Sequence, residues 1–455
     1  MNKNIKLETA TELPSDLEFS DEFRKAFDVL ENSRENVFVT GNAGTGKSTL
    51  LEYFRVNTRK NIIVLAPTGV AAIKARGQTI HSFFRLPPRL IMEEHIKQLH
   101  IGNLIHRIDV VVVDEASMVR ADMMDAMDHS LRLNRNEYNV PFGGVRVILF
   151  GDLFQLPPVV NKDIKNMMRR RYKTPYFFSA NVFKEIGLKT INLNKIYRQK
   201  DKKFIDLLNK IREKKCNTED LNSLNERVEK NIKGDAEGII TLATTNRGAN
   251  KINEKHLTEI PHEEYRYCAE IKEEFEEKAY PTEGCITLKK NAQIILLRND
   301  PKKRWVNGTI CEIIELTDEF IRADIDGRIC DIPKMTWEKI KYRYNKEKDS
   351  IEEEVVGSFT QYPVKLAWAI TIHKSQGQTF DNVIIDIGEG AFTHGQTYVA
   401  LSRCTTLEGI RLKKPITHDD IIFDDDIYDF MNEVNNANDV RLVDLDEGQG
   451  MRDEG

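Results

Sequence analysis

The sequence has few cysteines and no long apolar run. Its 455 residues include six cysteines, which are widely spaced and form no Cys-x-x-Cys pair. This spacing argues against a zinc site and a disulfide framework, and it favours a reducing, cytoplasmic location. The longest aliphatic stretches, such as residues 110–113, are strand-sized and far short of the ~20 apolar residues of a membrane span. The N-terminus lacks the apolar core of a signal peptide, so we expect neither secretion nor a membrane partner.

Neither sign of charge dominates the chain. There are 67 Lys and Arg residues against 72 Asp and Glu, and the formal net charge is −5. This balance opposes wholesale binding to polyanions but allows a local basic groove, because electrostatic potentials act locally. At about 100–200 residues per domain, the length indicates two to four domains.

Short apolar runs alternate with amphipathic stretches through the first half of the chain. The predicted strands are residues 36–40, 62–66, 110–114 and 145–150. This alternation predicts an α/β fold with a parallel sheet and ligands at the carboxyl ends of its strands. A second α/β rhythm begins near Thr190. It has predicted helices at 202–214, 218–230, 247–257 and 395–403, and predicted strands at 239–242 and 383–387.

Two intervals do not follow this alternation of strands and helices. Residues 77–107 look like an insertion in the first α/β unit. Residues 298–362 contain short, β-branched stretches at 309–316 and 319–325, which predict a small inserted β-barrel. The end of the chain is acidic, with a C-terminal tail at 431–455, and its last dozen residues are expected to fray.

The strongest local motif is a P-loop. Residues 41–48 read Gly-Asn-Ala-Gly-Thr-Gly-Lys-Ser, between a predicted strand and a predicted helix. Backbone N–H groups of such a loop wrap phosphates at a helix N-terminus, Lys47 reaches the β- and γ-phosphates, and Ser48 holds Mg²⁺. We therefore predict an ATP and Mg²⁺ site. Its nucleotide-binding residues are Gly41, Ala43, Gly44, Thr45, Gly46, Lys47, Ser48 and Thr49.

Further polar residues suit ATP hydrolysis. Asp114 and Glu115 follow four valines, so Asp114 would act on Mg²⁺ and Glu115 on the attacking water. Gln155, in Gly-Asp-Leu-Phe-Gln-Leu-Pro-Pro, follows another predicted strand and would sense the γ-phosphate. Arg198 and Arg403 are candidate arginine fingers, provided that the second α/β domain faces the first across the nucleotide.

In order and spacing, these motifs resemble the petite-integration-frequency family of DNA helicases, in the B branch of superfamily 1. The match extends from about residue 35 to 405. The segments that carry it are 41–48, 66–72 (Ala-Pro-Thr-Gly-Val-Ala-Ala), 79–81 (Thr-Ile-His), 114–118, 151–158, 193–199, 371–377 (Thr-Ile-His-Lys-Ser-Gln-Gly) and 399–403 (Val-Ala-Leu-Ser-Arg). Residues 129–150, with Pro-Phe-Gly-Gly before a strand, are similar to the stretch that separates this family from its RecD-like and phage relatives.

The resemblance implies an ATP-dependent DNA helicase that translocates 5′-to-3′ on single-stranded DNA and separates tailed or forked duplexes. It implies two RecA-like domains with ATP between them and DNA across their top. The implied parts are a leading segment (1–34), domain 1A (35–185) with a wedge (77–107), domain 2A (186–297 and 363–430) and an SH3-like barrel (298–362). Family members act in DNA repair, recombination and telomere maintenance. The short N-terminus is typical of a compact bacterial or phage-like member, active as a monomer.

By position, the resemblance also assigns roles to residues. The catalytic set is Lys47, Glu115, Gln155, Arg198 and Arg403; Ser48 and Asp114 are the metal residues, and Gly377 joins the nucleotide site. The DNA-contacting set is Thr68, Thr79, His81, Asn246, His373, Lys374 and Ser375. The family usually reads adenine with a Gln ahead of the P-loop. Residues 19–23 contain none, so adenine selectivity is loose or depends on main-chain contacts.

Several alternatives stay open. The basic run 169–173 either tracks DNA phosphates or is a solvated cluster, and Phe83 and Phe84 either stack on bases or plug the core. Two other functions compete: a P-loop DNA-binding switch that does not unwind, and a subunit of a RecD-type nuclease complex. The two candidate arginine fingers oppose the first, and the lack of a nuclease-like motif opposes the second.

Overall fold

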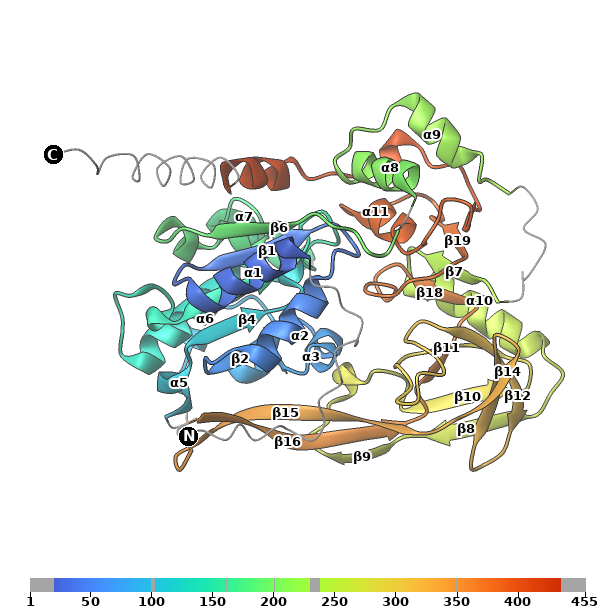
Figure 1. The fold of residues 1–455 in the computed structure, drawn as a ribbon, viewed down its shortest axis with the longest axis horizontal. Coiled ribbons are helices and arrows are strands. Elements are labelled where there is room, and N and C mark those ends of the chain that lie inside the picture. The colour runs from blue at the N-terminus through green and yellow to red at the C-terminus, as the bar shows by residue number, and fades with distance from the viewer. Residues whose placement is uncertain are drawn as a thin grey trace.

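The computed structural model describes residues 20–99, 103–160, 162–199, 201–229, 238–348 and 350–434. These residues form two α/β lobes and an antiparallel β region (Figure 1). The first lobe comprises residues 20–193, the second lobe the described residues of 201–259 and 367–424, and the β region residues 264–366. None of the described helices has the length and apolar character to cross a membrane.

The first lobe is built on a parallel sheet in the spatial order β3-β2-β4-β5-β1-β6. Its strands are β1 (Val37–Gly41), β2 (Ile62–Ala66), β3 (Gln78–Thr79), β4 (Val110–Val113), β5 (Arg146–Phe150) and β6 (Lys189–Leu193). The four strands predicted in this half are confirmed, with ends shifted by one residue at most. The predicted start of the second domain at residue 186 is too early, because β6 pairs along its whole length with β1.

Helices cover both faces of this sheet. The helices are α1 (Asp21–Asn32), α2 (Lys47–Asn57), α3 (Gly69–Lys74), α4 (Ile80–Phe83), α5 (Leu104–Arg107), α6 (Ala121–Arg135) and α7 (Lys162–Arg171). Every residue of β4 is buried; Val110 and Val112 pack in the cluster with α1 and α2, and Val111 and Val113 in the cluster with α6. A strand covered on both faces needs apolar residues at every position, which explains the run of four valines.

The second lobe has a smaller parallel sheet in the order β18-β7-β19-β20. Its strands are β7 (Ile240–Ala243), β18 (Ala369–Thr371), β19 (Val383–Asp386) and β20 (Ile410–Leu412), and its helices are α8 (Lys202–Arg212), α9 (Thr218–Asn225), α10 (Asn246–Glu259) and α11 (Gln396–Leu401). The predicted elements here are confirmed in type. The helix predicted at 218–230 ends earlier, at Asn225.

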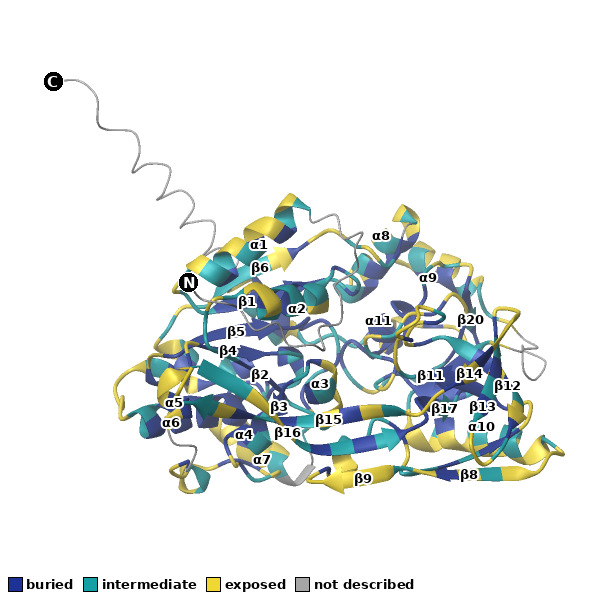
Figure 2. Ribbon diagram, turned by 60° about the horizontal axis from the view of Figure 1, so that its bottom comes forward, coloured by how far each residue is buried: buried dark blue, intermediate teal, exposed yellow. Residues whose placement is uncertain are grey.

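The β region contains a five-stranded antiparallel sheet in the order β14-β13-β12-β11-β17. These strands are β11 (Gln293–Leu296), β12 (Ile310–Leu316), β13 (Ile321–Ile325), β14 (Arg328–Ile332) and β17 (Val364–Leu366). The other strands are β8 (Glu264–Cys268), β9 (Glu270–Glu273), β10 (Cys285–Lys289), β15 (Met335–Asn345) and β16 (Ser350–Gln361). The antiparallel structure therefore extends beyond the predicted interval 298–362 on both sides. Figure 2 shows that β9 is exposed, whereas β1, β4 and β5 of the first sheet are buried.

The hairpin β15–β16 leaves the β region and runs along the first lobe (Figure 1). The Tyr342 hydroxyl, on β15, accepts a hydrogen bond from the Val64 N–H at 2.9 Å and donates one to the Val64 carbonyl at 3.3 Å. Strand β3 is only two residues long, so it leaves the edge of β2 open at Val64 for this contact. An ion pair of 2.6 Å between Arg55 and Glu353 adds a second attachment. Phe83 and Phe84 are buried, which confirms the core alternative for this pair.

One disulfide contradicts the expectation of unpaired cysteines. Cys268 and Cys285, 17 residues apart in sequence, are joined in the structure. The antiparallel register of β8 and β10 places the two residues directly opposite each other. Their separation in sequence hides this pairing, because it depends on the register and not on local spacing.

The end of the described chain returns to the first lobe. Residues 425–434 are helical, and the Phe430 ring stacks on Phe178 with centroids 4.3 Å apart. Asp426 pairs with Lys173 at 3.1 Å, so one cation of the basic run 169–173 has an acidic partner within the chain. Arg169, Arg170 and Arg171 are exposed at the end of α7. The rest of the predicted acidic tail and residues 1–19 lie outside the described residues.

Candidate functional site

The P-loop connects β1 to α2 with a backbone that only glycine adopts readily. Gly44 and Gly46 have φ of +84° and +87°, and Gly46 is the N-cap of α2. A side chain at Gly44 would lie 2.5 Å from the Cβ atom of Arg198, so the loop also lacks space for one. Thr45 is buried and donates from its hydroxyl to the Asn42 carbonyl at 3.0 Å. Backbone N–H groups at the start of a helix such as α2 are the donors that a phosphate uses.

Lys47 is folded back onto its own loop. Its Nζ donates to the carbonyls of Gly41 at 2.7 Å and Asn42 at 2.9 Å. Burial lowers the pKa of Lys47, although nearby Asp152 and Glu115 act in the opposite direction. A buried ammonium held only by carbonyls gains most from an anionic partner, which fits the predicted phosphate contact.

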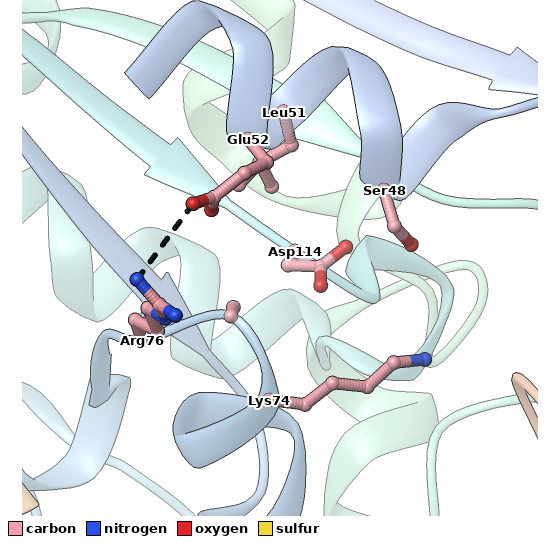
Figure 3. Close-up of a pocket in the computed structure, with 7 residues that line it drawn as sticks. Ser48, Leu51, Glu52, Lys74, Arg76 and Asp114 are labelled. Carbon is pink, nitrogen blue, oxygen red and sulfur yellow. Dashed lines mark ion pairs between the residues drawn. The ribbon is translucent and has the colours of Figure 1, made fainter. Parts of the chain in front are cut away.

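Ser48 and Asp114 line one cavity of about 250 Å³ at the start of α2 (Figure 3). Thr49, the next residue of α2, is half-buried. Burial, followed by the neighbouring Glu115, raises the pKa of Asp114 to about 6, so this carboxylate gains from a cation beside it. The described residues contain no cluster of three or more His, Cys, Asp or Glu side chains that could hold a metal alone. One carboxylate and one hydroxyl next to a phosphate loop fit Mg²⁺, which completes its shell with phosphate oxygens and water.

Glu115 has a strained backbone. Its φ and ψ are +51° and +44°, a left-handed conformation that costs a non-glycine residue about 1–3 kcal/mol and that clusters at functional sites. Its N–H donates to the Asp114 carboxylate at 2.9 Å.

Arg403 lies in the second lobe and is 1% exposed. Its guanidinium donates to the carbonyls of Val399 at 2.9 Å, Ser375 at 3.3 Å and Gln378 at 3.4 Å, and to the Ser402 hydroxyl at 2.9 Å. Burial lowers its pKa to about 9, and the nearby charge of Arg198 acts in the same direction. Within the described residues no carboxylate pairs with it, so this cation is available to a phosphate.

The second lobe touches the P-loop directly. The Tyr398 hydroxyl, on α11, accepts a hydrogen bond from the Ala43 N–H at 3.0 Å, and burial raises the pKa of Tyr398 to about 12. Arg198 follows β6 and donates to the Ser402 carbonyl at 3.2 Å. Gly377, with φ of +76°, lies against the amine of Lys74 from α3. The structure thus gathers the P-loop, both predicted arginine fingers and Gly377 at one junction between the lobes.

Gln155 lies at the same junction. Its Nε2 donates to Asp152 at 3.0 Å, and its Oε1 accepts from Gln376 of the second lobe at 3.3 Å. Sequence reasoning missed Tyr398, Asp152 and Lys74 as members of the site. Tyr398 lies within one helical turn of the predicted Arg403 finger segment, which is the one local signal for it.

An exposed aromatic ring lies beside the P-loop. Tyr197 is 45% exposed, and a Cβ at Gly46 would lie 3.8 Å from its ring. The carboxylate of Glu22 is occupied by the N–H of Asn194 at 2.9 Å and that of Lys195 at 3.3 Å. Residues 20–23 contain no Asn or Gln side chain to read a base, in agreement with the missing Gln.

The predicted DNA contacts follow the carboxyl ends of strands in both lobes. Thr68 is the N-cap of α3 and accepts from the Ala71 N–H at 3.2 Å. Thr79 is the N-cap of α4 and accepts from the Ser82 N–H at 3.1 Å. Both hydroxyls therefore stabilise a helix start and retain a donor hydrogen for a phosphate.

The remaining predicted contacts differ in exposure. Asn246 begins α10 and is exposed, as is Lys374. His81 and His373 are half-buried, and burial lowers the pKa of each. Ser375 is fully buried, and its hydroxyl donates to the carbonyl three residues earlier at 2.7 Å. The structure therefore turns Ser375 toward the interior.

Comparisons with known proteins agree with this site. A family model described as PIF1-like helicase matches residues 18–222, and one described as UvrD-like helicase C-terminal domain matches residues 366–407. The ATP-dependent DNA helicase Pif1 of Bdellovibrio bacteriovorus is 32% identical over 414 residues, covering 87% of this chain and 88% of that protein. A crystal structure of Bacteroides sp Pif1 in complex with ADP-AlF4 has a TM-score of 0.86 at 38% identity, covering 93% of this chain and 98% of that one.

A second Bacteroides structure differs in arrangement. The crystal structure of Bacteroides Pif1 bound to ssDNA has the same 38% identity and covers the same 93% of this chain and 98% of its own, but its TM-score is 0.68. Because identity and coverage are equal, the lower TM-score means that parts of the ssDNA complex are arranged relative to one another differently from the same parts of this chain. The two RecA-like α/β lobes, the P-loop site between them and these relatives together show that the chain belongs to the PIF1-like helicase family.

Proposed function

We propose that this chain is an ATP-dependent DNA helicase that translocates 5′-to-3′ on single-stranded DNA and separates tailed or forked duplexes. The observation that carries the proposal is the junction between the lobes, where Tyr398 of the second lobe contacts the P-loop of the first and the charges of Arg403 and Arg198 act on each other. A site of this kind changes when the γ-phosphate is lost, which suits a cycling motor better than a static switch. The DNA part is supported by relatives that are named DNA helicases and by the Bacteroides complex with ssDNA.

Each residue of the site has a separate role in ATP hydrolysis in this proposal. Lys47 exchanges its two loop carbonyls for phosphate oxygens. Ser48 and Asp114 would hold Mg²⁺, which would supply charge neutralisation at the phosphates. Glu115 orients the attacking water and accepts its proton, and Arg198 and Arg403 stabilise the charge on the transferring phosphoryl group.

The nucleobase lies on the exposed ring of Tyr197 in this proposal. Stacking is tolerant of base identity, because every base presents a π-face. With no side-chain amide in residues 20–23 to read adenine, we expect the enzyme to hydrolyse other nucleoside triphosphates nearly as well as ATP.

Single-stranded DNA crosses the carboxyl ends of both sheets. Thr68, Thr79 and His81 form the grip of the first lobe, and Asn246, His373 and Lys374 that of the second. We assign the wedge to residues 77–107 and an SH3-like barrel to the β region around 298–362, with domain 2A on either side of it. Given the bacterial relatives, we place the enzyme in the bacterial cytoplasm and expect a monomer to be active.

DNA binding requires the β region to move. The hairpin β15–β16 is docked on the first lobe, and Ala279 of the β region contacts Gly69, next to Thr68 at the start of α3. The structure resembles the nucleotide complex of Bacteroides Pif1 (TM-score 0.86) more than its ssDNA complex (0.68). We therefore propose that the docked hairpin belongs to the DNA-free state and is released on binding.

The test is unwinding of two matched partial duplexes, one with a 5′ single-stranded tail and one with a 3′ tail. We expect ATP-dependent opening of the 5′-tailed duplex only, and none by Lys47→Ala. Opening of the 3′-tailed duplex alone would refute the polarity. Opening of neither, with ATPase still stimulated by single strands, would refute the helicase activity of the isolated chain and leave a translocase.

A further inference from the structure

The loop that carries Gln155 is embedded in the second lobe. We call residues 152–155, which follow β5 of the first lobe, the sensor loop. The second-lobe residues that contact it are Arg212, Gln376, His394 and Gly395. A Cβ at Gly395 would clash with the carbonyls of Phe154 and Gln155, so the two backbones pack directly on each other.

Arg212 makes the most extensive of these contacts. It is the last residue of α8, and its Nη2 donates to Asp152 Oδ1 at 3.1 Å. Its Cζ lies 3.7 Å from the centroid of the Phe154 ring. The side chains of Arg212 and Asp152 are 10% and 1% exposed, so this is a buried ion pair between the lobes. Planar stacking and hydrogen bonding together fix a guanidinium in a way that a lysine amine cannot reproduce.

Asp152 links Arg212 to Gln155, because its carboxylate accepts hydrogen bonds from both side chains. Its second oxygen accepts from Gln155 Nε2 at 3.0 Å, while its first also accepts from the Phe154 N–H at 3.2 Å. The carboxylate therefore orients the amide of Gln155, the predicted sensor of the γ-phosphate. Burial alone would raise the pKa of Asp152, but Arg212, followed by Lys47, holds it below its usual value. The ion pair thus also keeps a negative charge beside Lys47.

A neutral histidine supports the loop from the other side. His394 Nδ1 accepts from the Asp424 N–H at 3.1 Å, so its Nε2 carries the proton and donates to the Leu153 carbonyl at 3.0 Å. These contacts hold the loop from the second lobe, while Leu153 and Phe154 also pack in the core cluster of the first lobe. A shift of the sensor loop on loss of the γ-phosphate therefore acts on α8 as well as on the first lobe.

We propose that Arg212 is a positioning residue that couples the nucleotide state at Gln155 to movement of the second lobe. The inference rests on the proposed motor function and deepens it. Arg212 acts through Asp152 and does not bind the nucleotide itself. A variant without Arg212 should still hydrolyse ATP but should unwind fewer base pairs for each ATP that it consumes.

The test uses Arg212→Gln together with Arg212→Met/Asp152→Asn. The single variant leaves Asp152 buried without its partner and risks unfolding, whereas the double variant removes both charges at similar volume. Lys203→Gln, an exposed position on the same helix, is the matched control. The readouts are ATP consumed per base pair unwound, the KM for ATP and the thermal midpoint.

We expect the double variant to keep its thermal midpoint, whereas its KM for ATP shifts because Asp152 lies beside Lys47. The ATP consumed per base pair should rise about three- to tenfold, within the range of couplings in one contact network. Equal losses of ATPase and unwinding in a folded variant, which leave that ratio at the wild-type value, would overturn the proposal. If the wild type does not unwind, the helicase proposal fails separately. The role of Arg212 is then measured as stimulation of ATPase by single-stranded DNA, where an unchanged stimulation overturns it.

Discussion

The docked hairpin gives a quantitative prediction about DNA affinity. In Tyr342→Phe the ring stays in place, but the N–H and the carbonyl of Val64 lose the hydroxyl that pairs with them at 2.9 and 3.3 Å. Leaving a buried polar group without its partner costs about 1–3 kcal/mol. In the undocked state water solvates the same groups, so the cost falls on the docked state alone.

This cost converts directly into a binding constant. If single-stranded DNA binds only the undocked form, its apparent dissociation constant falls by the factor by which docking is weakened. A docking penalty of about 1–3 kcal/mol corresponds to roughly 5- to 150-fold tighter binding, which is the upper limit when the docked form dominates. Glu353→Gln, which breaks the 2.6 Å ion pair to Arg55, should shift affinity in the same direction by a smaller factor, since that pair is partly exposed.

The assay is fluorescence anisotropy with a labelled oligothymidine and no nucleotide. Tyr138→Phe, which removes the hydroxyl from a residue that is 59% exposed, is the control. We expect the order of affinity to be Tyr342→Phe, then Glu353→Gln, then the control and the wild type together. Equal affinity for all four proteins would refute the competition between the hairpin and DNA.

Three further predictions concern the active site and its pH dependence. Glu115→Gln should retain nucleotide and DNA binding while turnover falls about 10²- to 10⁴-fold in a phosphate-release assay; normal turnover would remove Glu115 from the role of base. Arg403→Lys keeps a cation but loses the planar fork, so we expect a large part of the ~10³–10⁵ that an arginine finger contributes to kcat to disappear, with ATP affinity measured alongside by equilibrium titration. Intact kcat would contradict that role. Burial lowers the pKa of His394 below the unfolded value of about 6.5, so the folded state binds fewer protons there, and stability present above pH ~6.5 is lost as the pH falls. In urea unfolding at several pH values, the free energy of unfolding of His394→Gln should fall less on acidification than that of the wild type. If the two proteins show the same dependence of this free energy on pH, His394 does not contribute to the loss of stability in acid.

The sequence by itself determined the local parts of this protein. The P-loop, the Asp114–Glu115 pair and the four buried strands around them are each specified by a few neighbouring residues. Strand β4 is recognisable because burial on both faces demands apolar residues throughout. The resemblance then follows from the order of such motifs, which needs no knowledge of contacts.

Only the tertiary structure decided how distant segments meet. The Tyr398 hydroxyl and the Ala43 N–H are 355 residues apart, and Tyr342 and Val64 are 278 apart. The predicted lobe boundary missed β6, because its mostly half-exposed residues become part of the first sheet only through pairing with β1. The pairing of Cys268 with Cys285 and that of Arg212 with Asp152 have no local signal either. Hydrogen bonds, ion pairs and strand registers depend on where the packed chain places two groups, and neither partner's neighbours encode that position.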